Sequence, residues 1–153
     1  QIPAGVATGQ KLKLRGQGNE SATGGKTGDL FVLIEVREHE LFRRRGADVL
    51  VEAPLLFSEA ALGADLLVPT LDGSTTIRIP AGTPSGKVFR LAGRGLADPR
   101  GAKSGDLLVK VLIEVPTHLS TGQADALRSA SRTLPASAHP ARLAYDEALA
   151  ARR

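Results

Sequence analysis

Short strand-like segments recur along this chain in two matching sets. Residues 10–15 alternate polar and apolar side chains, which is typical of a half-buried strand. Residues 29–37 form an apolar, β-branched run after a Gly-Asp pair and predict a longer strand, buried on much of both faces. Residues 87–91 and 106–115 repeat these two patterns. The hydrophobic pattern therefore predicts a mostly β protein with the same two strands in each half.

The segment between the two sets adds further elements. Residues 38–47 are charged and predict a connector, and residues 49–57 predict another strand. Residues 58–63 read as one helical turn with Ser58 as its N-cap. The Asp72-Gly73 pair between two strand-like runs predicts a β-hairpin.

The spacing of apolar residues changes from strand-like to helical after residue 118. Small apolar residues at helical spacing predict a helix over 119–132, with Ser120 as its N-cap. Residues 134–140 form a Pro/Ala/Ser linker, and 141–153 predict a last short helix.

The two strand sets belong to an internal repeat. Residues 2–32 match residues 79–109 at a constant offset of 77 residues with no gap, and 14 of these 31 positions are identical. The shared positions include Ile-Pro-Ala-Gly, two Gly-x-Gly pieces and Gly-Asp-Leu. Because glycine serves where the backbone turns or comes close to another chain segment, a glycine framework indicates a shared backbone. Copy 2 is preceded by about thirty strand-like residues and copy 1 by Gln1 alone, so we expect a piece of a longer protein that starts inside its first module.

Composition narrows the class of protein. The chain has no cysteine, which excludes disulfides and cysteine-bound zinc within it. No apolar run reaches the roughly 20 residues of a membrane helix, and the N-terminus does not resemble a signal peptide. We therefore expect a cytoplasmic protein. The net charge of +4 permits acidic partners.

Catalytic chemistry has little support in the sequence. His39, His118 and His139 lack metal-ligand spacing, so we expect no metal, no cofactor and no enzyme. Asp29 and Asp106 are the best carboxylate candidates. Each follows a glycine in its own copy, which favours a role in accepting hydrogen bonds at the turn.

Two binding functions remain open. The first is a nucleic-acid module, because Lys11, Lys13 and Arg15 lie on one face of a strand, although stacking aromatics are nearly absent. The second is capture of an extended apolar segment on the strands that follow the Gly-Asp turns. Its candidate residues are Leu30, Val32 and Ile34 in copy 1 and Leu107, Val109 and Val111 in copy 2. Spacing alone favours a core role for all six.

Ordered motifs then point to a family. They are I-P-A-G-V-x-x-G-x-x-L-x-L-x-G-x-G, G-D-L-F-V, H-x-x-F-x-R-x-G-x-D, E-A-A-L-G, V-P-T-L-D-G and the second I-P-A-G/G-D-L-L-V set. Over nearly the whole chain, through about Leu127, this resembles the C-terminal region of bacterial DnaJ-type heat-shock co-chaperones. The family's J-domain signature, its Gly/Phe linker and its zinc-binding cysteines are absent from this sequence.

The resemblance implies both an architecture and a function. It implies two tandem β-sandwich-like domains, the first incomplete at its N-terminus (1–46 and 47–117), and a helical dimerisation segment (118–153). It implies binding of unfolded or aggregation-prone polypeptides, delivery to a DnaK-type ATPase chaperone, and homodimers. It also implies a client groove partly lined by the strand Leu30–Ile34, with Val32 as the closest positional match. The implied dimerisation residues are Leu119, Gln123, Leu127 and Ala130.

Overall fold

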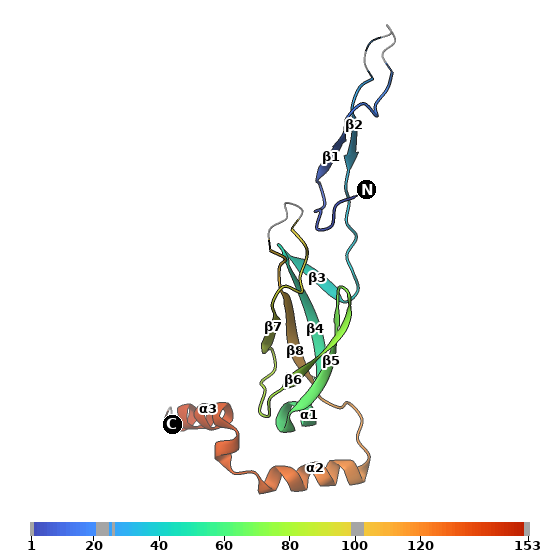
Figure 1. Ribbon diagram of the computed structural model, residues 1–153. Helices are drawn as coiled ribbons and strands as arrows, with labels where there is room; N and C mark the ends of the chain where they lie inside the picture. The colour runs from blue at the N-terminus through green and yellow to red at the C-terminus, as the bar shows by residue number, and fades with distance from the viewer. Residues whose placement is uncertain (1, 21–24, 26, 99–102, 152–153) are drawn as a thin grey trace. The chain divides into compact units, whose positions relative to one another are not determined.

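A computed structural model describes residues 2–20, 25, 27–98 and 103–151 (Figure 1). The chain divides into two compact units, Gln1–Glu114 and Val115–Arg153. The first holds the strands and the second holds only helices. The predicted mostly β fold with C-terminal helices is confirmed, whereas the division of the β part into domains 1–46 and 47–117 stays a prediction.

The first copy of the repeat forms an antiparallel hairpin. Strands β1 (Lys11–Leu14) and β2 (Leu30–Leu33) pair in a register that places Leu12 opposite Val32 and Leu14 opposite Leu30. The predicted strand over 29–37 is therefore too long, and its expected burial on both faces is wrong. Among the described residues no further strand pairs with this hairpin, and most of its side chains are exposed.

The second copy is built into a four-stranded sheet of order β3-β4-β8-β7 (Figure 1). The central strands β4 (Asp48–Leu56) and β8 (Leu107–Glu114) run parallel. Strands β3 (Phe42–Arg45) and β7 (Val88–Leu91) pair antiparallel to them at the edges. The predicted connector over 38–47 is wrong in part, since β3 lies inside it.

A two-stranded ribbon covers one face of this sheet. Strands β5 (Ala64–Thr70) and β6 (Gly73–Ile79) form the predicted hairpin, although Thr70 pairs with Gly73 and the turn is Leu71-Asp72. Between β4 and β5 lies the short helix α1 (Phe57–Leu62). Its N-cap is Leu56 and not the predicted Ser58; the carboxylate of Glu59 accepts a hydrogen bond from the Leu56 N–H (3.0 Å).

The core of the first unit lies between this ribbon and the four-stranded sheet. Alternate residues of β4 and β8 point toward the ribbon, and their side chains have little or no exposed surface. Val68 of β5 and Ile79 of β6 close the core from the other side. The buried apolar residues of this core are Val49, Val51, Ala53, Leu55, Ala60, Val68, Ile79, Leu107, Val109 and Val111.

The second unit contains three helical segments. Helix α2 (Thr121–Thr133) begins at the predicted N-cap, because the Ser120 Oγ accepts from the Gln123 N–H (3.3 Å) and Gln123 Oε1 accepts from the Ser120 N–H (2.8 Å). A short 3-10 segment η1 (Ala136–Ala138) leads to helix α3 (Pro140–Ala150). None of these helices has a buried side chain.

Candidate functional site

Equivalent backbone hydrogen bonds show that the repeat is structural. The Gly9 N–H donates to the Ile34 carbonyl (2.8 Å), and 77 residues later the Gly86 N–H donates to the Val111 carbonyl (2.7 Å). Further equivalent pairs are Gly18 N to Gly28 O with Gly95 N to Gly105 O, and Val36 N to Thr8 Oγ1 with Ile113 N to Ser85 Oγ. The same positions of the two copies can therefore be compared one by one.

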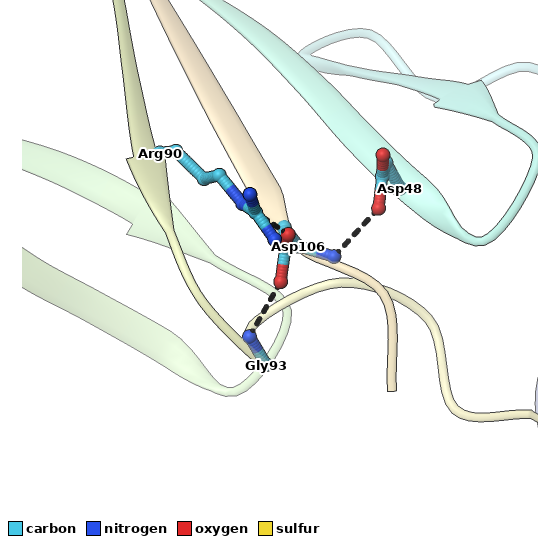
Figure 2. Close-up of polar contacts among 4 residues, drawn as sticks. All are labelled: Asp48, Arg90, Gly93 and Asp106. Carbon is cyan, nitrogen blue, oxygen red and sulfur yellow. Dashed lines mark hydrogen bonds and ion pairs between the residues drawn. The ribbon is translucent and has the colours of Figure 1, made fainter. Parts of the chain in front are cut away.

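The two Gly-Asp turns use their carboxylates in the same way. Asp29 Oδ1 accepts from the Gly16 N–H (3.0 Å), and its other oxygen lies 2.6 Å from the Lys13 Nζ. In copy 2, Asp106 accepts from the Gly93 N–H (2.8 Å) and forms an ion pair with Arg90 (Figure 2). Each carboxylate therefore ties the end of one strand to the start of the next within its own copy, which fits the turn role.

Stability at acidic pH should depend on this turn. The Gly93 N–H, with a smaller effect of Arg90, lowers the pKa of Asp106 below its ordinary value of 3.8. The stabilisation is therefore present above that value and lost as the pH falls through the lowered pKa. We expect Asp106→Asn to flatten the decline of the melting temperature between about pH 5 and about pH 2.

Asp65→Asn is the matched control for this measurement. The Asp65 side chain is exposed and makes no hydrogen bond or ion pair with any residue that the structure describes. We expect its melting curve to follow the original chain at every pH. Equal slopes for the Asp106 variant and the original chain would contradict the assignment.

The turn of copy 2 is closed by the neighbouring strand. Asp48 Oδ1 accepts from the Asp106 N–H (2.8 Å; Figure 2). The Val49 N–H donates to the Asp106 carbonyl (2.9 Å). A Cβ on Gly105 would lie 2.0 Å from the Ala47 carbonyl oxygen, so this segment passes directly over the glycine. Within the described residues, the equivalent Gly28 meets only the Asn19 carbonyl oxygen, at 3.6 Å.

The predicted binding residues of copy 2 lie inside the core. Leu107, Val109 and Val111 have no exposed surface, since the β5–β6 ribbon and helix α1 cover that face of β8. A side chain without exposed surface cannot contact a client unless the core opens. We therefore assign these three residues to the core and do not carry them forward as binding residues.

The same positions of copy 1 are largely uncovered. Leu30 is 43% exposed and Val32 is partly exposed, although their copy 2 counterparts are fully enclosed. Only Ile34 is buried, at 8% exposure. The hairpin register adds Leu12 and Leu14, which lie opposite Val32 and Leu30 on the same face and which sequence reasoning missed. Leu12, Leu14, Leu30 and Val32 form what we call the apolar hairpin face.

The opposite face of the hairpin is mixed in character. Phe31 and Leu33 are 60% and 66% exposed and lie opposite Lys13 and Lys11. The Lys13 ammonium lies 5.7 Å from the centre of the Phe31 ring, a cation–π distance, and it also pairs with Asp29. The basic residues that suggested nucleic-acid binding are thus interleaved with apolar residues, and one of them is already paired.

The predicted dimerisation residues lie at helix α2. Leu119 and Leu127 line an open groove of about 400 Å³, together with Ala124, Arg128, Ser131 and Arg132. Gln123 caps the helix, as described above, and Ala130 is exposed. Leu119 and Leu127 are 44% and 37% exposed, so this helix presents apolar surface that its own unit leaves open.

A metal centre has no support in the described part of the chain. Among those residues no group of three or more His, Cys, Asp or Glu side chains could hold a metal ion. In the same residues, no helix combines the length and the apolarity needed to cross a membrane.

Comparison with known families agrees with the ordered motifs. The model of the DnaJ C terminal domain family matches residues 1–116, which include both copies of the repeat. This family consists of co-chaperones and is not a class of enzymes. The match covers about three quarters of the chain and reaches from the hairpin of copy 1 to the end of the four-stranded sheet. The chain therefore belongs to the DnaJ C-terminal domain family of DnaJ-type co-chaperones.

Proposed function

We propose that the apolar hairpin face binds unfolded or aggregation-prone polypeptides. The supporting observations are the family match over residues 1–116 and the four apolar side chains that share one face of the hairpin in the given sequence. Leu107 and Val109 are fully enclosed, whereas Leu30 and Val32 retain exposed surface. An exposed apolar cluster on a soluble domain favours interaction with another apolar surface.

Strand geometry suggests how such a segment would bind. Strand β2 pairs only with β1 among the described residues, which leaves its second edge open for backbone hydrogen bonds to an extended peptide. Alternate apolar side chains of the client would then meet Leu30 and Val32. Each square ångström of apolar surface removed from water contributes roughly 25 cal/mol before ordering costs, so one small face gives a weak and reversible site.

The family match supports the further parts of this proposal. We propose that the parent protein delivers bound clients to a DnaK-type ATPase chaperone in the cytoplasm. We also propose that two chains associate through helix α2, so that two weak sites act on one client. Linking two sites raises the effective affinity without any new contact.

A binding titration tests the proposed function. A labelled, permanently unfolded polypeptide is titrated with the chain at low and at moderate salt, and its fluorescence anisotropy is followed. We expect saturable binding with a shallow salt dependence, because apolar contact changes little with ionic strength. Binding to a nucleic acid through phosphates would instead weaken steeply with salt, and such a dependence would favour the basic-module alternative. Absence of binding would contradict the proposal.

The proposed dimer is tested by truncation. A chain ending at Pro116 keeps every strand of the structure and lacks helix α2. We expect it to be a folded monomer by light scattering and circular dichroism, whereas the full chain dimerises. A truncated chain that still dimerises would remove α2 from this role. A second variant, Leu127→Glu, should give the same monomer without removing any backbone.

A further inference from the structure

One arginine joins the two copies of the repeat. Arg44 lies in strand β3, where it pairs with Val49 of the core strand β4. Its guanidinium donates to the Val6 carbonyl through Nη1 (2.6 Å) and to the Gly5 carbonyl through Nη2 (2.9 Å). Its Nε donates to the Gly46 carbonyl (2.9 Å). One side chain therefore binds its own turn and a turn almost forty residues earlier.

The three bonds use the fork of the guanidinium. Two of its nitrogens reach adjacent carbonyl groups of the first copy while the third is fixed to the β3–β4 turn, a geometry that the single ammonium of lysine cannot reproduce. The neighbouring Arg45 makes no side-chain hydrogen bond or ion pair with any described residue. The arrangement thus belongs to position 44 and not to the basic run as a whole.

Few hydrogen bonds connect the described parts of the two copies. The first copy extends to Val36, whose N–H donates to Thr8 Oγ1 (2.9 Å), as the equivalent bond in copy 2 shows. Residues 37–41 contain no helix or strand. Among the described residues, only the hydrogen bonds of Arg44 link the range 2–36 to the range 42–114. No ion pair links the described residues of these two ranges.

The turn that Arg44 binds is fixed by hydrogen bonds to another segment in both copies. Gly5 has a positive φ of 79°, and the equivalent Gly82 has 75°, so the two Ile-Pro-Ala-Gly turns share one conformation. In copy 2 this turn is fixed by its N–H groups: Gly82 and Thr83 both donate to the Ala60 carbonyl of α1 (2.9 and 3.1 Å). In copy 1 the carbonyl groups of Gly5 and Val6 accept hydrogen bonds instead, and the donor is Arg44.

We propose that Arg44 is a positioning residue that clamps the first copy to the second and so fixes the direction of the β1–β2 hairpin relative to the four-stranded sheet. The five residues 37–41 would otherwise leave the hairpin free to reorient about the connector. The hydrogen bonds of Arg44 involve no residue of the apolar hairpin face, so the proposal goes beyond client binding and does not depend on it.

The absence of cysteine from the chain makes a distance measurement direct. Spin labels are attached at Lys11→Cys in β1 and Thr76→Cys in β6, both exposed positions, and the distance distribution is recorded in the full chain without client. We expect one narrow distribution in the original sequence and a broad one after Arg44→Ala. Arg45→Ala, a neighbouring arginine without such bonds, is the matched control and should leave the distribution narrow.

A second variant and a measurement of secondary structure complete the test. Arg44→Gln keeps most of the stem but loses the fork, and it should broaden the distribution as Arg44→Ala does, which covers the case in which the alanine variant folds poorly. Circular dichroism should show unchanged strand content in each variant. A narrow distribution in both Arg44 variants, or a broad one in the original sequence, would overturn the proposal. Neither result depends on whether the hairpin binds a client.

Discussion

Gly105→Ala is expected to lower the free energy of unfolding by about 2 kcal/mol or more, the usual scale of a forced clash in a packed site. The new Cβ would lie 2.0 Å from the Ala47 carbonyl oxygen and 2.3 Å from its carbonyl carbon, and both are backbone atoms that cannot rotate away. Moving them would disturb the bonds of Asp48 and Val49 to the Gly-Asp turn. Urea denaturation followed by circular dichroism measures the loss.

Gly28→Ala is the matched control, because it makes the same change at the equivalent position of copy 1. Among the described residues, its Cβ would meet only the Asn19 carbonyl oxygen, at 3.6 Å, which is an ordinary van der Waals contact. We expect a change within about 0.5 kcal/mol, as for substitutions away from packed sites. Equal losses for the two variants would show that the segment over Gly105 does not close that turn as described.

The substitutions Val32→Asp and Val109→Asp should affect different properties, client binding in the first case and stability in the second. Val109 has no exposed surface, so Val109→Asp would place an unpaired carboxylate in the core and should cost about 3 kcal/mol or more of stability. Val32 is partly exposed, so Val32→Asp should leave the fold intact. It should weaken client binding about tenfold, since losing one apolar contact of about 1.5 kcal/mol changes the dissociation constant by that factor.

Together, the Val32 and Val109 variants separate an effect on client binding from an effect on folding. Thermal melts report the stability of each variant, and the anisotropy titration reports the affinity for an unfolded polypeptide. Lys11→Asp serves as control for added negative charge, because Lys11 lies on the opposite face of the hairpin. Unfolding of the Val32 variant would place Val32 in a core. Unchanged affinity in a folded Val32 variant would move the binding site off the apolar hairpin face.

Local patterns predicted most of the elements. Alternation predicted β1 and β7, and the Ser120 cap predicted the start of α2, because these signals depend on residues near in sequence. Strand β3 was missed because its Arg-Arg-Arg sequence looks like a solvated turn. It becomes a strand by pairing with β4, an edge position where charged side chains can face solvent.

Burial could not be predicted from the repeat itself. Leu30 and Leu107 are identical residues in identical motifs, yet one is exposed and the other is enclosed. The difference comes from β4, which pairs with β8, and from the β5–β6 ribbon, which covers it. All three strands precede Leu107 in the chain and lie outside its Gly-Asp-Leu motif. The contribution of Leu12 to the apolar hairpin face was missed for a related reason. It depends on the register of β1 against β2, and the polar segment between the two strands contains no pattern that specifies this register.

Amide chemical-shift mapping tests the central claim most directly. The ¹⁵N-labelled chain, at 16.0 kDa, is titrated with an unlabelled unfolded polypeptide, and the shift of each amide signal is followed. We expect the largest shifts at Leu12, Leu30 and Val32, with the enclosed strand β8 unaffected. Shifts confined to the four-stranded sheet or to helix α2, with the hairpin signals unmoved, would contradict it.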